Sequence, residues 1–310
     1  MTWIRLFTGL FVIFFAGKRH AQYGYVYLEQ SGIKSPWLRT FSWHIINAFP
    51  EASIVFLSAS VLPQAVFNLA LIWSIFLLNF VILSLAILAK KEEFKLSTPK
   101  HQTSFVFLLA FTLLFLVSLV PKFQASVFHI GWPSLCFLVG YTFYLHRFRF
   151  EEGKLELDLS PMVLFLRFFT ATLLIFAGAG QVVYGCKELV IQFHWSPFLT
   201  AAFLLAPIAC LPKIPSVWQK EINIAFFTER VTEANILLVG LFLFFTDVFY
   251  LKSDIYQKAS FFHFLFALVA AFFVLLHFFL GKMDLKKKKI FSSITILTYF
   301  LLTGLTLINK

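Results

Sequence analysis

A carboxylate occupies a position in this sequence where a charge is costly. Glu51 directly follows Pro50 inside an apolar run between residues 36 and 62. A proline removes a backbone hydrogen bond from a helix and bends it, and a charged group in an apolar segment is unfavourable unless it is paired, neutralised or hydrated. Glu51 is therefore the first candidate for a functional side chain, as the ligand of a cation or as a group that carries a proton.

A second proline followed by a charge occurs in the other half of the chain. Pro212 precedes Lys213, again inside an apolar run. If the two segments cross in the fold, an ion pair between Glu51 and Lys213 is the most economical arrangement, because each charge offsets the cost of removing the other from water. The sequence thus predicts two helix breaks, at Pro50 and Pro212, that bring opposite charges together.

Further polar side chains in apolar segments could face the same cavity. Asn68 and Asn79 are eleven residues apart, about three helical turns, and would lie on one face of a helix. Asp247 has an alternative position near the outer end of its segment, beside Lys252, where water can solvate it. The predicted ion or substrate ligands are Glu51, Lys213, Asn47, Asn68, Asn79, Asn235 and Asp247.

Patterns of catalysis and of metal binding are missing from the sequence. There is no Ser-His-Asp order, phosphate loop or paired-carboxylate hydrolase pattern, so we expect no catalytic residues, no cofactor and no enzyme. His44 and His129 have no second ligand at metal-binding spacing, which favours packing for both. If a metal ion binds at all, Glu51 is its expected ligand.

The elements that must position these residues are membrane helices. Of 310 residues, 60% are hydrophobic and 13% charged, and 44 are phenylalanine. A soluble domain of this size has too little interior to bury so much apolar surface, so lipid is the expected solvent. The net charge of +11 follows the expected membrane topology and does not indicate a nucleic-acid partner. The oligomeric state cannot be predicted.

Apolar stretches of about 20 residues, the length needed to cross a bilayer, recur along the whole chain. We predict about ten transmembrane helices, so that both termini lie on one side of the membrane. The expected spans are 4–28, 36–62, 66–89, 104–121, 127–146, 161–190, 195–218, 231–251, 259–281 and 290–308.

Basic residues concentrate in the links that follow the odd-numbered spans. These links include residues 90–100, 147–158 and 282–289, whereas the opposite side carries few basic residues. Because cytoplasmic loops are enriched in Lys and Arg, these links are expected in the cytoplasm. Both termini are then outside, in a multi-pass protein of the cell (plasma or inner) membrane.

The two halves of the chain resemble each other. A shift of 161 positions superimposes Tyr23-Gly24 on Tyr184-Gly185 and Ser35-Pro36 on Ser196-Pro197, and one further position brings Pro50 onto Pro212. Each half has an odd number of spans, so the second must enter the membrane from the opposite side, which is the inverted repeat of many secondary transporters. The predicted domains are 1–146, a first five-helix repeat; 147–160, a cytoplasmic linker; and 161–310, a second five-helix repeat.

The order of these motifs resembles a known family. Ala16-Gly17, Ser31-Gly32-Ile33 and Pro50-Glu51 follow one another as in the repeat of the calcium:cation antiporter superfamily, the sodium/calcium exchangers, and the second half keeps the spacing. The resemblance implies an all-α exchanger-like fold and an antiporter. It also implies that Glu51 matches the first ion-binding glutamate and that Asn79 lies near an ion-binding asparagine.

The sequence departs from that family at the ion site. The family's Gly-Thr-Ser reads Ile46-Asn47-Ala48 in the first copy, and its second glutamate is Lys213. Calcium takes six to eight oxygen ligands, commonly several from carboxylates, so the calcium site is expected to be degenerate. We therefore expect a secondary transporter of a cation or another small solute; the alternative is a structural or regulatory membrane protein that keeps the fold without transport.

Overall fold

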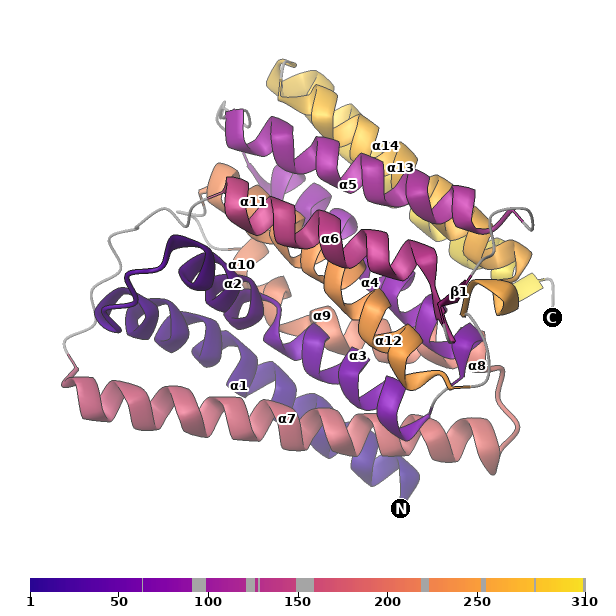
Figure 1. Ribbon diagram of the computed structural model, residues 1–310, viewed down its shortest axis with the longest axis horizontal. Helices are drawn as coiled ribbons and strands as arrows, with labels where there is room; N and C mark the ends of the chain where they lie inside the picture. The colour runs from indigo at the N-terminus through magenta and orange to yellow at the C-terminus, as the bar shows by residue number, and fades with distance from the viewer. Residues whose placement is uncertain are drawn as a thin grey trace.

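The computed structural model describes residues 1–62, 64–90, 99–120, 126–127, 129–148, 159–218, 223–251, 255–281 and 283–308. Within these residues the chain is a bundle of helices with one two-stranded hairpin, in which segments distant in sequence lie side by side (Figure 1).

In the first half of the chain, the described residues form six helices and the hairpin. These elements are α1 (Thr2–Gln30), α2 (Pro36–Asn47), α3 (Phe49–Val61), α4 (Ala65–Ala89), α5 (Pro99–Ser118), β1 (Ser126–Val127), β2 (Ile130–Gly131) and α6 (Trp132–Arg147). The two strands pair antiparallel, with Ser126 opposite Gly131.

The second half begins with the longest helix and continues with two segments in which the helix type changes. Its elements are α7 (Pro161–Ile191), α8 (Pro197–Leu199), η2 (Thr200–Leu205), α9 (Ala206–Cys210), η3 (Leu211–Lys213), α10 (Ile214–Val217), α11 (Ile224–Leu237), η4 (Leu238–Phe242), α12 (Leu243–Phe249), η5 (Ile255–Lys258), α13 (Phe261–Leu280) and α14 (Leu285–Ile308). The segments η2 and η4 are π-helical, and η3 and η5 are 3₁₀ turns.

Prolines set the start of several helices. Pro36, Pro133, Pro161 and Pro197 each lie in the first turn of their helix, where the absent N–H has no partner to lose and the fixed φ suits the helix. One predicted boundary is wrong for this reason. The span expected to start at residue 127 starts at Trp132, because residues 126–131 form the hairpin and Pro133 favours a helix start.

In the described part of the chain, six helical stretches are long and apolar enough to cross a membrane, and seven are if a bent pair counts as one. The six are Ala65–Ala89, Pro161–Ile191, Pro197–Val217, Ile224–Phe249, Phe261–Leu280 and Leu285–Ile308, and the bent pair is Pro36–Asn47 with Phe49–Val61. This protein is therefore a multi-pass membrane protein.

Helix α4 is the centre of the core. Its residues are apolar on every side, and most of them are fully buried, including Trp73, Phe76 and Phe80. A helix that is hydrophobic all round must be covered by neighbours, and α3, α9, α11, α13 and α14 all pack against α4. Polar residues on α4 therefore face other helices.

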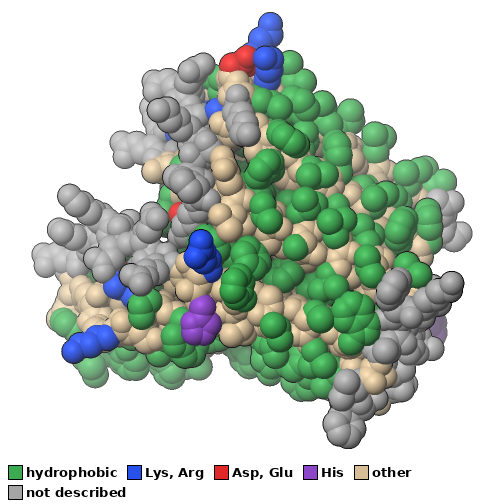
Figure 2. All heavy atoms as spheres, turned by 45° about the horizontal axis from the view of Figure 1, so that its top comes forward, with side chains coloured by type: hydrophobic (Ala, Val, Ile, Leu, Met, Phe, Trp, Pro, Cys, Tyr) green, Lys and Arg blue, Asp and Glu red, His purple; other side chains and the backbone are tan. Residues whose placement is uncertain are grey.

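The outer surface of the molecule is also largely apolar. Exposed hydrophobic side chains line α1, α7, α13 and α14, among them Phe11, Phe176, Phe272 and Leu301. In the view of Figure 2, hydrophobic side chains cover the right part of the face, and the visible Lys and Arg side chains lie toward its left and upper edges. This distribution is that of a protein whose outer surface contacts lipid.

Helices α1 and α7 run beside each other along the bottom of the molecule in Figure 1. Glycines allow this close contact: a methyl group at Gly9 would lie 2.6 Å from the carbonyl oxygen of Gly178. Close packing through small residues is typical of helix pairs in membranes. Further along α1, a methyl group at Gly17 would lie 2.6 Å from Cγ of Pro212 and 3.4 Å from Cγ of Pro50. Helix α1 therefore contacts both prolines through one residue.

Candidate ion-binding site

The bend between α2 and α3 positions Glu51. The two helices form an angle of 80° at Ala48, and Pro50 and Glu51 occupy the first turn of α3. Pro50 is tolerated there because a first-turn N–H has no partner within the helix. The positive end of the helix dipole also favours a carboxylate in this turn. The bend thus gives Glu51 a local environment that partly compensates its charge.

Lys213 lies at an irregular part of the segment from Pro197 to Val217. Pro207, Pro212 and Pro215 fall within nine residues of one another, and the helix changes from π to α to 3₁₀ along this stretch. Each proline removes one backbone donor, which accounts for a succession of short helical pieces. Lys213 ends the 3₁₀ turn η3.

Glu51 and Lys213 form the ion pair expected from their positions. The Lys213 ammonium also donates a hydrogen bond of 3.0 Å to Oδ1 of Asn79 on α4. The Asn79 amide in turn donates to Oδ1 of Asn235 on α11 at 2.8 Å, and the Asn235 amide donates to the carbonyl oxygen of Phe76 at 3.2 Å. One chain of polar contacts therefore connects α3, η3, α4 and α11.

This cluster is closed off from its surroundings. Glu51 is 1% exposed and Lys213 6%, while Asn79 and Asn235 are fully buried. Breaking a buried pair by removal of one partner leaves an uncompensated charge, so the two charges depend on each other. The pair is neutral as a unit, and the ammonium lies between a carboxylate and an amide oxygen, where a bound cation could also be held.

The same geometry limits which ions could bind. Glu51 is the carboxylate of this cluster, and Oδ1 of Asn235 already accepts a bond from Asn79. Among the described residues, no group of three or more His, Cys, Asp and Glu side chains could hold a metal ion. Six to eight oxygens, as calcium requires, are thus not assembled by the residues of this cluster.

Two of the predicted site residues make other contacts. Asn47, at the end of α2, donates to the Arg230 carbonyl oxygen at 2.8 Å and accepts from Nε of Arg230 at 2.7 Å. Asn68 accepts from Ser58 at 2.8 Å and donates to the Leu62 carbonyl oxygen at 3.2 Å. The contacts of Asn47 hold α2 against α11, and those of Asn68 fix the turn from α3 to α4.

Asp247 belongs to a different cluster. Its carboxylate accepts a hydrogen bond from the backbone N–H of Gly131 and one from the hydroxyl group of Ser134, both at 2.7 Å. These two residues lie at the start of α6. It also accepts from the N–H of Ile255 at 3.1 Å. These bonds hold the end of α12 against the hairpin and η5. The alternative neighbour of Asp247, Lys252, lies outside the described residues.

Sequence reasoning missed one buried carboxylate. Glu233 on α11 is 2% exposed, accepts a hydrogen bond of 2.8 Å from Nε1 of Trp43, and lies 3.8 Å from Nε2 of His44. Its position gave a signal, because Glu233 is two residues before Asn235, which was already a candidate. The span predicted to start at residue 231 placed Glu233 near the membrane surface, whereas α11 starts at Ile224.

The arrangement of these helices occurs in known structures. The chain matches the sodium-calcium exchanger NCX_Mj with a TM-score of 0.60 at 15% identity, over 97% of this chain and 98% of that one. It matches the H⁺/Ca²⁺ exchanger CAX with a TM-score of 0.64 at 14% identity, over 97% and 87%. The corresponding values for YfkE are 0.69 and 12%, over 97% and 90%.

The chain has the exchanger fold. The resemblance to the calcium:cation antiporter superfamily is thus confirmed at the level of the fold. No protein-family model and no curated protein sequence matches the chain. With identities of 15% or less, the shared feature is the arrangement of helices, and the side chains of the central cluster must be interpreted on their own chemistry.

Proposed function

We propose that this protein is a secondary transporter that exchanges a monovalent cation for a proton at the Glu51–Lys213 cluster. The observation that carries the proposal is the ion pair itself, with Asn79 as a second partner of the ammonium. Two sodium- or proton-coupled calcium exchangers share the fold, which supports cation exchange as the class of activity.

The whole-chain architecture we propose is ten transmembrane helices in two inverted repeats. This architecture counts the helical stretches that are long and apolar enough to cross a membrane, and it adds α1, α5 and α6. These three helices are amphipathic, shorter or charged near their ends. The first repeat is 1–146, the cytoplasmic linker 147–160 and the second repeat 161–310. The protein lies in the cell membrane with both termini outside, as the Lys and Arg bias favours.

Charge balance explains why Lys213 suits proton exchange. In the resting state the carboxylate of Glu51 is neutralised by the Lys213 ammonium. For a monovalent cation to take the place of the ammonium, Lys213 must release its proton, after which the amine is neutral and the carboxylate is balanced by the cation. The cluster has zero net charge in both states, so it can be buried in both. One cation then moves in exchange for one proton.

Calcium is a poor substrate in this scheme. A divalent cation beside a single carboxylate would leave one uncompensated positive charge in the core, in addition to its missing oxygen ligands. The degenerate calcium site expected from Lys213 is therefore part of the proposal.

Cation flux in proteoliposomes tests the function. Vesicles with an imposed pH difference would be assayed with a panel of Li⁺, Na⁺, K⁺ and Ca²⁺ through the fluorescence of an internal pH dye. We expect proton release that depends on one monovalent cation, is unaffected by a clamped membrane potential, and is abolished by Glu51→Gln. The matched control is Glu188→Gln. It removes a carboxylate outside the central cluster, which pairs with Arg5 near the start of α1.

The alternative, a non-transporting protein with the exchanger fold, is favoured by one observation. The Lys213 ammonium pairs with Glu51 and donates to Asn79, so the protein's own side chains compensate its charge in a buried cluster. In that case the same assay would show no flux for any cation at any pH, and Glu51→Gln would change stability alone. That outcome would contradict the transport proposal.

A further inference from the structure

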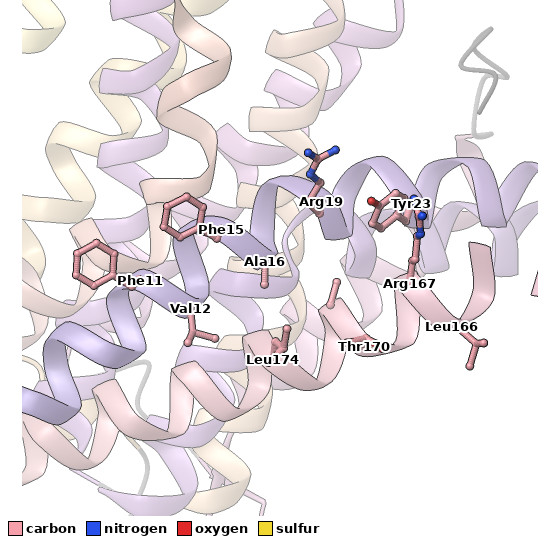
Figure 3. A pocket seen from close by; sticks show the side chains of 11 residues that line it. Phe11, Val12, Phe15, Ala16, Arg19, Tyr23, Leu166, Arg167, Thr170 and Leu174 are labelled. Carbon is pink, nitrogen blue, oxygen red and sulfur yellow. The ribbon is translucent and has the colours of Figure 1, made fainter. Parts of the chain in front are cut away.

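A groove on the outer surface, apart from the central cluster, lies between α1 and α7. It has a volume of about 580 Å³ and is lined by Phe11, Val12, Phe15, Ala16, Arg19, Tyr23, Leu166, Arg167, Thr170, Ala171 and Leu174. Figure 3 shows these side chains on the two neighbouring helices, with Phe11, Phe15 and Leu174 toward one end and Arg19, Tyr23 and Arg167 toward the other. The groove is therefore apolar along most of its length and basic at one end.

The shape of the groove follows from how α1 and α7 touch. The helices approach closely at Gly9 and Gly178, and α1 meets α7 again where Gly24 lies against Phe168. Between these contacts, small residues line the groove: Ala16 on α1, and Thr170 with Ala171 on α7. The groove lies on the surface of the helix pair along this stretch, and its lining there is mainly apolar.

The basic end carries two exposed arginines. Arg19 and Arg167 are both exposed, and the guanidinium of Arg167 lies 6.0 Å from the centre of the Tyr23 ring. Among the ion pairs between described residues, none involves either arginine. Guanidinium groups bind phosphate oxygens in bidentate geometry, so this end of the groove suits an anionic phosphate.

The surroundings indicate lipid as the occupant. Large hydrophobic side chains on both helices, such as Phe7, Phe169 and Leu173, are exposed beside the groove, where the protein would face the bilayer. Arg19 and Arg167 also flank segments expected in the cytoplasm, and anionic phospholipids concentrate in the leaflet that faces the cytoplasm. An anionic phospholipid satisfies both ends of the groove, with its acyl chain against the phenylalanines and its phosphate between the arginines.

We propose that the groove between α1 and α7 is a binding site for one anionic phospholipid, held by Arg19 and Arg167. This site does not depend on transport: it requires neither Glu51 nor Lys213.

Competition between two lipids in native mass spectrometry tests the proposal. Delipidated protein in a neutral detergent would be titrated with an equimolar mixture of phosphatidylglycerol and phosphatidylcholine of the same acyl chains. We expect one phosphatidylglycerol to be retained preferentially. Arg19→Gln/Arg167→Gln should weaken its retention about thirtyfold, as the loss of two basic contacts near a lipid headgroup predicts. A second variant, Thr170→Trp, fills the groove and should weaken retention while both arginines remain.

The matched control is Arg147→Gln/Lys286→Gln, which removes two exposed basic residues expected on the same side of the membrane. It should retain phosphatidylglycerol as the wild type does. Unfolding temperature in lipid-free detergent checks that every variant is folded. Equal retention of both lipids by the wild type, or equal retention of phosphatidylglycerol by the wild type and the Arg19→Gln/Arg167→Gln variant, would overturn the proposal.

Discussion

At the scale of single residues, Glu51 and Lys213 dominate the energetics of the site. Both are almost fully buried and each is the other's counter-charge. A buried pair adds little net stability when it is compared with a well-packed apolar pair, but the removal of one partner is strongly destabilising. The two residues should therefore behave as one unit in mutagenesis.

This coupling can be measured with a double-mutant cycle. Glu51→Ala and Lys213→Ala should each lower the free energy of unfolding by about 3–5 kcal/mol, because each leaves one buried charge unpaired. The double variant should be more stable than either single variant. Thermal unfolding and folded yield in detergent provide the readout.

The control cycle is Arg5→Ala with Glu188→Ala, an ion pair whose side chains are 41% and 19% exposed. Its coupling should be at most about 1 kcal/mol, as for other solvated pairs. Additive effects of Glu51→Ala and Lys213→Ala would show that the two charges are independently solvated.

A second prediction concerns the identity of residue 213. Lys213→Glu places two carboxylates together, where their charges repel, and a cation that bridges them should relieve the repulsion. Millimolar calcium should raise the unfolding temperature of Lys213→Glu, by ligand stabilisation of about 2.7 kcal/mol at 100 times Kd. The wild type and the neutral control Lys213→Gln should not respond. Strong calcium stabilisation of the wild type would refute the idea that Lys213 takes the place of a cation.

How much of the site the sequence could predict depends on the residue. Glu51 and Lys213 stand out because each is a charge after a proline in an apolar run, and their contact follows from crossing segments. Asn79 and Asn235 were among the candidates, and the family resemblance singled out Asn79. The residue pattern alone did not distinguish either from Asn68, which bonds to Ser58 and Leu62 instead. Which amide faces the ammonium depends on how α4 is rotated about its own axis. A helix that is apolar on all sides has no hydrophobic periodicity from which this rotation could be predicted.

At the scale of elements, α1 is the helix that contacts both prolines. Gly17 lies against Pro212 and Pro50 at once, and a proline ring cannot move aside as a flexible side chain can. The break at Pro50 was expected from the sequence, but its size was not, since a proline at the start of a new helix is compatible with a range of angles. The 80° bend arises because Ala48 leaves the helical conformation, with φ −106° and ψ 17°.

Gly17→Ala tests whether this contact matters. The added methyl group would overlap Pro212, so we expect destabilisation of about 1–3 kcal/mol, as for overpacking elsewhere. Gly180→Ala is the control: a methyl group there meets nothing within 4 Å, and alanine favours a helix by about 1 kcal/mol over glycine. Unfolding temperatures of the two variants give the comparison, and equal values would argue against a tight α1 contact.

At the scale of the whole molecule, the sequence predicted the order of the helices better than their ends. Each expected span overlaps described helices that start or end within a few residues of its predicted bounds, such as α4 and α14. The start of α6 was missed, since a short hairpin of apolar residues such as Val127 and Ile130 is as hydrophobic as a helix of the same length. Hydropathy reports burial, and it does not distinguish the two backbone conformations.

Membrane orientation can be tested by cysteine labelling in intact cells. The background would be Cys136→Ala/Cys186→Ala/Cys210→Ala, since Cys136 is exposed. Lys34→Cys and Lys286→Cys should resist a membrane-impermeant thiol reagent and react only after permeabilisation, because basic links are expected inside. Phe193→Cys, in the turn after α7, should react in intact cells. The reverse pattern would invert the proposed topology.

The contact between Glu51 and Lys213 also bears on how the chain could be divided. One half supplies only the acid and the other only the base, so two copies of residues 1–146 would bring two carboxylates together and two copies of 161–310 two ammonium groups, each unfavourable in a buried site. Fragments cut within 147–160 and expressed together should therefore assemble as an unlike pair, whereas either fragment alone should lack a stable partner. If the two halves arose by duplication, they were once interchangeable. The replacement of an acid by a base in one half would then make each half require the other as its partner.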